Sequence, residues 1–241
     1  MKHVSLLFSA IILCCLLLCS CKENTISGSG SIGNEQRDAG SFNAIEIAVP
    51  LKAVITVGGQ AAVKLSGYKN ILKYIKTEVK DNKLRIWTEP GVSLDNAEYL
   101  NAEISVPSLT ALELEGAPDV DIKGSITGQD FKLSISGASD IKIDDVSTTN
   151  FSTSVSGAGD VKIDKGNVQT AAYTVSGAGD IKAYGLHTSQ TTAEISGTGD
   201  VQVYAEQSLT ASISGAGNLR YKGHPKVTSQ TSGVGAVEDA N

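Results

Sequence analysis

Apolar and polar residues alternate one by one along most of the chain. In the segment FKLSISG, residues 131–137, every second position from Phe131 to Ile135 is apolar, and the positions between carry Lys or Ser. After a break that contains glycine, the alternation resumes with Ile141 and Ile143. A period of two is typical of a β-strand with one face on the core and the other in solvent. The pattern therefore predicts strands on both sides of a turn.

A short glycine motif separates these strands at a nearly constant spacing. In its most regular form the motif reads SGAGD, and its copies carry their first glycine at positions 116, 137, 157, 177, 197, 215 and 233. About 20 residues can hold two or three short strands with their turns, but not a strand–helix–strand unit of about 30 residues. Such a period is typical of a solenoid. We therefore predict an all-β fold, a right-handed parallel β-helix (β-solenoid) with coils of about 20 residues.

Residues one period apart should stack in columns along this solenoid. Branched apolar residues recur at equivalent positions and predict the core. The first predicted core column is Ile135, Val155, Val175, Ile195 and Ile213. A second is Ile141, Val161, Ile181, Val201 and Leu219, and a third is Ile143, Ile163, Ala183 and Val203.

The motif itself is predicted to form the corner of each coil. Glycine permits a positive φ and a close approach of neighbouring coils, and the Asp can accept hydrogen bonds from turn amides. Lys two positions after the Asp should point to the same side and offset the column of carboxylates. We expect a structural role for the corner residues Gly137, Asp140, Gly157, Asp160, Gly177, Asp180, Gly197 and Asp200.

Calcium is the alternative for these corners. Calcium-binding solenoids repeat G-G-x-G-x-D-x-U-x every nine residues. Here the period is near 20, no residue separates Gly179 from Asp180, and Lys182 adds a positive charge. We therefore predict no metal site, and no cofactor.

The first half of the chain keeps the strand pattern without the glycine corner. Residues 68–80, YKNILKYIKTEVK, predict a short helical turn followed by a strand; KLRIWTEP predicts another strand and SLDNAEYL a loop. We predict one solenoid domain over residues 36–241. Within it, residues 36–115 form irregular coils that cap the N-terminal end, and residues 116–241 hold the repeats.

The N-terminus has the features of a bacterial export signal. A short positive region precedes an apolar run that ends in LCSC, and all four cysteines of the chain lie within the first 21 residues. This ending resembles a lipobox, and the resemblance implies a lipoprotein signal peptide over residues 1–20 and lipidation of Cys21. An ordinary signal peptide or an anchor helix are the alternatives. Residues 21–35, rich in Gly and Ser, are predicted to be a flexible tether.

Charge narrows the choice of partners. The formal net charge is −6, and an acidic chain does not offer the basic surface that nucleic acid requires. A lipid anchor would make the membrane a partner, and the acidic body should stand off its anionic headgroups. We predict a lipid-anchored protein of the bacterial cell envelope, at the outer membrane or cell surface. The sequence does not indicate an oligomeric state.

Several segments also resemble a known family. RDAGSFNAIEIAVPLKAVITVGG, NILKYIKTEVKDNKLRIW and ISVPSLTALELEGAPDV, followed by SGAGDI copies, are similar to the head-GIN-domain family of putative auto-transporter adhesins. The resemblance covers about residues 30–225. It implies a β-solenoid and an envelope location, and it implies little about chemistry.

The sequence favours a binding protein over an enzyme. No catalytic residue is predicted: His187 lies in a turn, and no long loops build a cleft. Tyr184, Tyr204 and Tyr221 are predicted to form an exposed face that could bind a glycan or a protein. A stiff acidic rod that scaffolds the envelope is the alternative, and a polysaccharide-active β-helix enzyme is the less favoured one.

Overall fold

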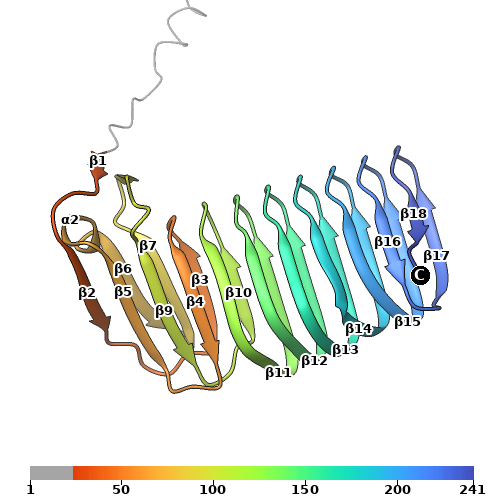
Figure 1. The fold of residues 1–241 in the computed structure, drawn as a ribbon, viewed down its shortest axis with the longest axis horizontal. Coiled ribbons are helices and arrows are strands. Elements are labelled where there is room, and N and C mark those ends of the chain that lie inside the picture. The colour runs from red at the N-terminus through yellow and green to blue at the C-terminus, as the bar shows by residue number, and fades with distance from the viewer. Residues whose placement is uncertain (1–23) are drawn as a thin grey trace, which may run out of the picture.

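The computed structural model describes residues 24–241, so the predicted signal peptide and Cys21 lie outside the described residues. The described chain is a stack of strand-built coils along one axis (Figure 1). Neighbouring coils are joined by parallel pairing about 20 residues apart, which confirms the predicted parallel β-solenoid. Within residues 24–241, no helix is both long and apolar enough to cross a bilayer.

The regular coils each consist of one long strand and one glycine corner. These strands are β11 (Asp119–Ile135), β12 (Ile141–Val155), β13 (Val161–Val175), β14 (Ile181–Ile195) and β15 (Val201–Ile213). In β12 the alternation of buried and exposed residues slips at Asp144–Asp145 and again at Thr149–Asn150. The strand therefore bends twice, and the coil has three short faces. This agrees with the expected two or three short strands per coil. We call the short stretch between the bends, residues 145–149 in β12, the middle segment. In Figure 1 the glycine corners lie along the upper edge of the stack, and the bends of the long strands lie along the lower edge.

The core contains the three predicted columns, and every member of them is buried. A further stack of aromatic rings fills the solenoid beside them. Phe131 and Phe151 lie in register on β11 and β12, with ring centroids 5.8 Å apart. Tyr173 of β13 meets Phe151 edge-on at 5.9 Å. Apolar side chains stacked on their own kind in this way bury most of the apolar surface of each coil.

The corner glycines are required by the close contact between coils. A Cβ added to Gly157, Gly177 or Gly197 would lie 1.8 Å from the carbonyl oxygen of the preceding corner glycine. The predicted positive φ is wrong at these three positions and at Gly137, because the corner turns without entering the left-handed region. Each glycine carbonyl instead accepts a hydrogen bond from the next coil, as when the Ala178 N–H donates to Gly157 at 2.9 Å.

The N-terminal coils are stacked out of chain order. β3 (Ala44–Ala48) and β4 (Lys52–Val57) form one coil, and β7 (Lys83–Thr88) and β9 (Asn101–Val106) lie on its outer side. The chain then returns to the inner side, where β10 (Ala111–Leu114) pairs with β3 and β11 pairs with β4. Because of this return, Lys52 lies between Asn101 and Asp119.

Antiparallel strands close the N-terminal end. β2 (Ile32–Arg37) pairs with β5 (Ala62–Tyr68), β5 also pairs with β9, and β6 (Ile75–Lys80) pairs with β7. The short helix α2 (Lys69–Leu72) buries Ile71 and Leu72 here. The predicted helical turn followed by a strand is confirmed by α2 and β6, and the predicted strand in KLRIWTEP by β7.

Two predictions for this region are wrong. Residues 24–35 of the predicted tether are not free: β1 (Asn24–Ser27) pairs with β8 (Val92–Asp95), and β2 joins the cap. Ile26 packs on the core, and the Asn70 side chain donates a hydrogen bond to the Ser27 carbonyl at 2.8 Å. β8 likewise replaces part of the predicted loop SLDNAEYL.

The C-terminal end finishes with β16 (Leu219–Lys222), β17 (Lys226–Thr231) and β18 (Val237–Asp239). Ser229 and Thr231 of β17 lie in register with the core residues Ala211 and Ile213 of β15, and both are exposed. A terminal coil with hydroxyl groups at former core positions presents a polar end to solvent.

Candidate functional site

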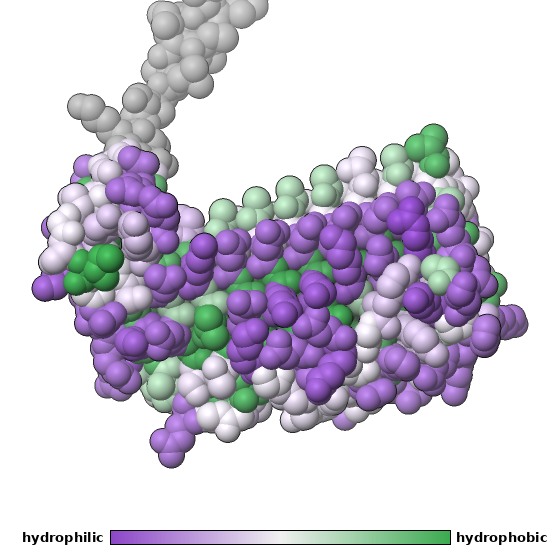
Figure 2. Space-filling model, viewed as in Figure 1, coloured by the Kyte–Doolittle hydropathy of each residue, from purple (hydrophilic) through white to green (hydrophobic). Residues whose placement is uncertain are grey.

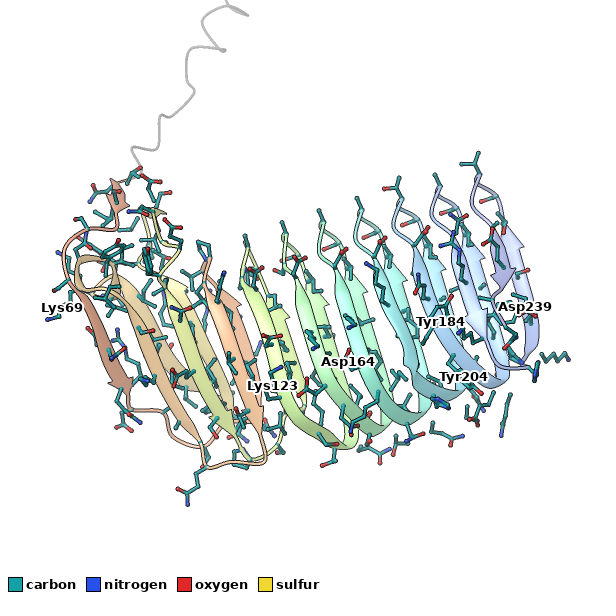
Figure 3. The ribbon with its side chains drawn as sticks, viewed as in Figure 1. Lys69, Lys123, Asp164, Tyr184, Tyr204 and Asp239 are labelled. Carbon is teal, nitrogen blue, oxygen red and sulfur yellow. The ribbon has the colours of Figure 1, made fainter. Side chains whose placement is uncertain are left out.

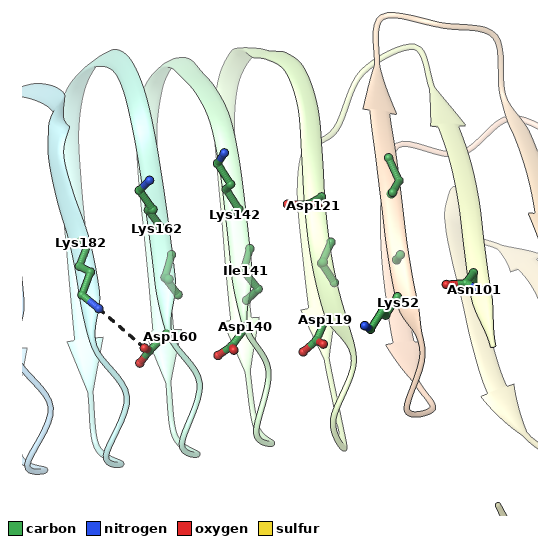
Figure 4. Close-up of a pocket in the computed structure, with 14 residues that line it drawn as sticks. Lys52, Asn101, Asp119, Asp121, Asp140, Ile141, Lys142, Asp160, Lys162 and Lys182 are labelled. Carbon is green, nitrogen blue, oxygen red and sulfur yellow. Dashed lines mark ion pairs between the residues drawn. The ribbon is translucent and has the colours of Figure 1, made fainter. Parts of the chain in front are cut away.

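A shallow trough runs along the solenoid axis beside the row of corners. Its volume is about 620 Å³, and it crosses β9, β4, β11, β12, β13 and β14 (Figure 4). Val120, Ile141 and Val161 form its floor. Figure 2 shows this face of the molecule as a band of apolar residues between two hydrophilic rows. We call this feature the axial trough.

Two rows of charged side chains form the banks of the axial trough. The corner bank contains Lys52, Asp119, Asp140 and Asp160, and the opposite bank contains Asp121, Lys142, Lys162 and Lys182. Asp121, Lys142, Lys162 and Lys182 are in register on four successive strands. Asp140 directly precedes β12 and Lys142 is its second residue, and both line the axial trough. The predicted column of Lys beside the column of Asp is therefore confirmed.

From Asp160 onward, the Asp column links successive corners by hydrogen bonds. The backbone N–H of Asp180 donates to Asp160 Oδ1 at 3.0 Å, and that of Asp200 donates to Asp180 Oδ1 at 2.8 Å. The carboxylates therefore bind the next coil, whereas we predicted bonds to nearby amides of the turn. Lys182 Nζ lies 3.8 Å from Asp160 and 3.9 Å from Asp180, and this offsets the repulsion between the stacked carboxylates.

Asp200, the last Asp of the column, has the densest set of partners. Its Oδ1 accepts hydrogen bonds from the backbone and side chain of Asn218, and Arg220 donates to its Oδ2 at 3.0 Å. Burial alone would raise the pKa of this carboxyl, but the bonds from Asn218 and Arg220 outweigh it and hold the pKa below its usual range.

Asp200→Asn should therefore lower stability in a way that depends on pH. A carboxyl group whose pKa is lowered in the folded state stabilises the fold at pH values above its unfolded pKa of about 4. This stabilisation is lost as the pH falls through the folded-state pKa. At pH 7 the variant should melt a few degrees below the wild type. The difference should shrink below about pH 4. Melting curves from pH 7 to pH 2 test this, and a difference that does not change with pH would contradict it.

Some charged side chains of the axial trough form ion pairs and others do not. Asp164 lies 3.3 Å from Lys142 Nζ and 3.0 Å from Lys162 Nζ. The hydrogen bond to Asp164 raises the pKa of Lys142. In contrast, Asp119, Asp121 and Asp140 form no ion pair with any residue that the structure describes, and neither does Lys52. The trough thus holds carboxylates that are free to meet a ligand.

The three candidate tyrosines do not stack in register as predicted; Figure 3 shows Tyr184 and Tyr204 in the C-terminal half of the solenoid. β15 has 13 residues against 15 in β14, and the register shifts after Ala183. Tyr204 therefore lies opposite His187, with ring centroids 4.0 Å apart, and not opposite Tyr184.

The other two tyrosines have separate surroundings. Tyr184 lies beside Lys222, whose Nζ is 5.0 Å from the ring centroid, and burial raises the pKa of its phenol. Tyr221 is in register with the core residue Val203 and packs partly on the core. The predicted arrangement is wrong because it assumed a constant register across coils of 20 and 18 residues.

The candidate histidine His187 lies outside the axial trough. His187 is on β14 with a half-exposed side chain, 3.8 Å from Glu206. In the part of the chain from residue 24 onward, no three His, Cys, Asp or Glu side chains are grouped so that they could hold a metal ion.

Lys52 and Asn101 join the axial trough from coils without the SGxGD motif. Nothing in the sequence pattern marks them, since their place depends on the stacking of β9, β4 and β11 out of chain order. The Asp and Lys columns can be recognised in the sequence, but the sequence pattern predicts only a structural role for them at the corners.

The fold and the trough define a class of protein: a β-solenoid with a long polar surface trough. A family model described as "Putative auto-transporter adhesin, head GIN domain" matches residues 41–225, and the chain belongs to this family. Its cell-surface or envelope character follows from the family. None of the curated proteins matches the chain.

Several solved structures share this fold. The chain is similar to a putative adhesin from Bacteroides fragilis, with 26% identity, a TM-score of 0.85, and coverage of 89% of this chain and 100% of the other. A putative adhesin from Parabacteroides merdae shares the fold at 21% identity, TM-score 0.72, and coverage of 90% and 99%. A putative lipid binding protein from Parabacteroides distasonis does so at 21% identity, TM-score 0.74, and coverage of 90% and 100%.

Proposed function

We propose that this protein is a non-enzymatic lipoprotein of the cell envelope that binds a glycan or protein partner at its solenoid surface, as an adhesin does. The observation that carries the proposal is the axial trough, a long open surface with carboxylates that have no partner in the described chain. Membership of an adhesin-named family supports the same role.

The lipid anchor is the part of the proposal that rests on the N-terminus. LCSC ends an apolar run, and after Cys21 the chain has no further cysteine. An acidic body on a lipid anchor would stand away from anionic headgroups and leave the trough accessible.

Cys21→Ser should abolish lipidation, and a processed variant should also lose membrane anchoring. The wild type should partition into the detergent phase of a phase-separating detergent after signal removal, and the variant should stay uncleaved or enter the aqueous phase. Intact-mass measurement should find the acyl chains on Cys21. Detergent partitioning of a processed Cys21→Ser protein equal to that of the wild type would contradict the anchor.

The binding role is tested by attachment of whole cells. Cells that carry the full chain should attach to immobilised mucin, fibronectin or a layer of neighbouring bacteria better than cells that lack it. Equal attachment to all three surfaces would contradict an adhesin and favour the acidic rod that scaffolds the envelope.

A further inference from the structure

We propose that the axial trough binds a linear, uncharged polysaccharide that lies along the solenoid axis. This inference rests on the proposed binding function and assigns the site and the chemical class of the ligand. Three properties of the trough carry it: its shape, the balance of its charges, and the hydrogen-bonding groups that it leaves free.

The shape of the trough suits a chain molecule. It crosses six neighbouring strands, roughly 24 Å at a strand spacing of ~4.8 Å, and it follows the solenoid axis on the surface. The length of a sugar ring is comparable to this spacing. From β11 to β14, successive strands therefore present charged side chains at matching positions to successive sugars of a linear polymer.

Both signs of charge line the trough, so neither a polyanion nor a polycation meets only charges of the opposite sign there. Its lining contains four lysines and four aspartates, so the formal charges cancel. The aspartates of the corner bank would repel a polyanion, and the lysines of the opposite bank would repel a polycation. A hydroxyl group both donates and accepts hydrogen bonds, so it can use a carboxylate on one side and an ammonium on the other.

The free groups lie where a sugar could reach them. The carboxylates of Asp119, Asp121 and Asp140 have no ion-pair partner within residues 24–241. Hydrogen bonds to charged groups are stronger than neutral ones. Beside Asp121, the side chain of Val54 is 41% exposed and offers an apolar surface for the C–H groups of a sugar ring.

Affinity electrophoresis of the full chain tests the proposal. The protein would be held in a polyoxyethylene detergent, which carries no sugar, and run in native gels that contain xylan, glucomannan or a linear β-glucan. Gels with polygalacturonate or chitosan provide the charged comparisons. At least one neutral polysaccharide should retard the protein, and more strongly than either polyion.

Two substitutions assign the binding to the trough. Asp140→Arg places a long cation across it at an exposed position and should weaken binding about tenfold or more, since it removes a charged acceptor and obstructs the path. The matched control is Gln169→Ala, in a polar pocket on the middle segments of neighbouring coils, and it should bind as the wild type does. Both variants should melt within a few degrees of the wild type.

Three outcomes would overturn the inference: no retardation by any of the neutral polysaccharides, stronger retardation by a polyion, or unchanged affinity of Asp140→Arg. The cell-attachment experiment separates this failure from failure of the proposed function. Attachment that depends on the chain without polysaccharide binding would leave the adhesin role standing and remove only the polysaccharide.

Discussion

Replacing Gly177 with valine should destabilise the solenoid more than any change on its surface. The added Cβ would lie 1.8 Å from the carbonyl oxygen of Gly157, which is backbone and can move only if the coils separate. Separation would also break the hydrogen bond from Ala178 N–H to the same oxygen. We expect a loss of more than about 3 kcal/mol of unfolding free energy. Chemical denaturation followed by circular dichroism measures it.

Ala178→Val is the matched control for this prediction. Ala178 is the next residue of the same corner, but its side chain is exposed. The same substituent there should change stability by less than about 0.5 kcal/mol. Equal losses for the two variants would show that the corner does not depend on close stacking of its glycines.

Phe151→Ala should cost about 3–5 kcal/mol because it leaves a cavity in the middle of the aromatic stack. The ring is 1% exposed and contacts both Phe131 and Tyr173. The coil cannot collapse onto the cavity, because its backbone is held by parallel pairing on both sides.

Phe151→Leu provides the comparison for this cavity. It retains most of the apolar volume and should lose less than half as much stability. Thermal and denaturant unfolding of both variants check the prediction, and a loss below about 1 kcal/mol for Phe151→Ala would contradict the packing described for the core.

The regular half of the fold follows from the sequence because its signals are local and repeated. The alternation around residues 131–135 and 141–143, with the recurring SGxGD corner, determines which residues face the core. The reason for glycine at the corner does not follow in the same way. Glycine can be required at a turn by a positive φ or by a close contact with a neighbouring coil. The contact between Gly177 and Gly157 involves two coils, so only the stacked structure shows that the second reason applies.

The cap and the site depend on contacts that the sequence pattern does not encode. Lys52 lies beside Asp119 only because residues 83–106 stack outside residues 44–57. The tyrosine face is a similar case, since the loss of two residues from β15 moves Tyr204 beside His187. Residues 24–35 are rich in Gly and Ser, yet their backbone pairs with strands far along the chain.

We propose that the axial trough is the partner-binding surface of a surface-anchored solenoid. The most direct measurement is the attachment of cells that carry Asp140→Arg, compared with cells that carry an equal surface amount of the wild type. We expect the variant to reach the surface, to melt as the wild type does, and to lose most of the attachment that the chain confers. Attachment equal to that of the wild type would contradict the claim.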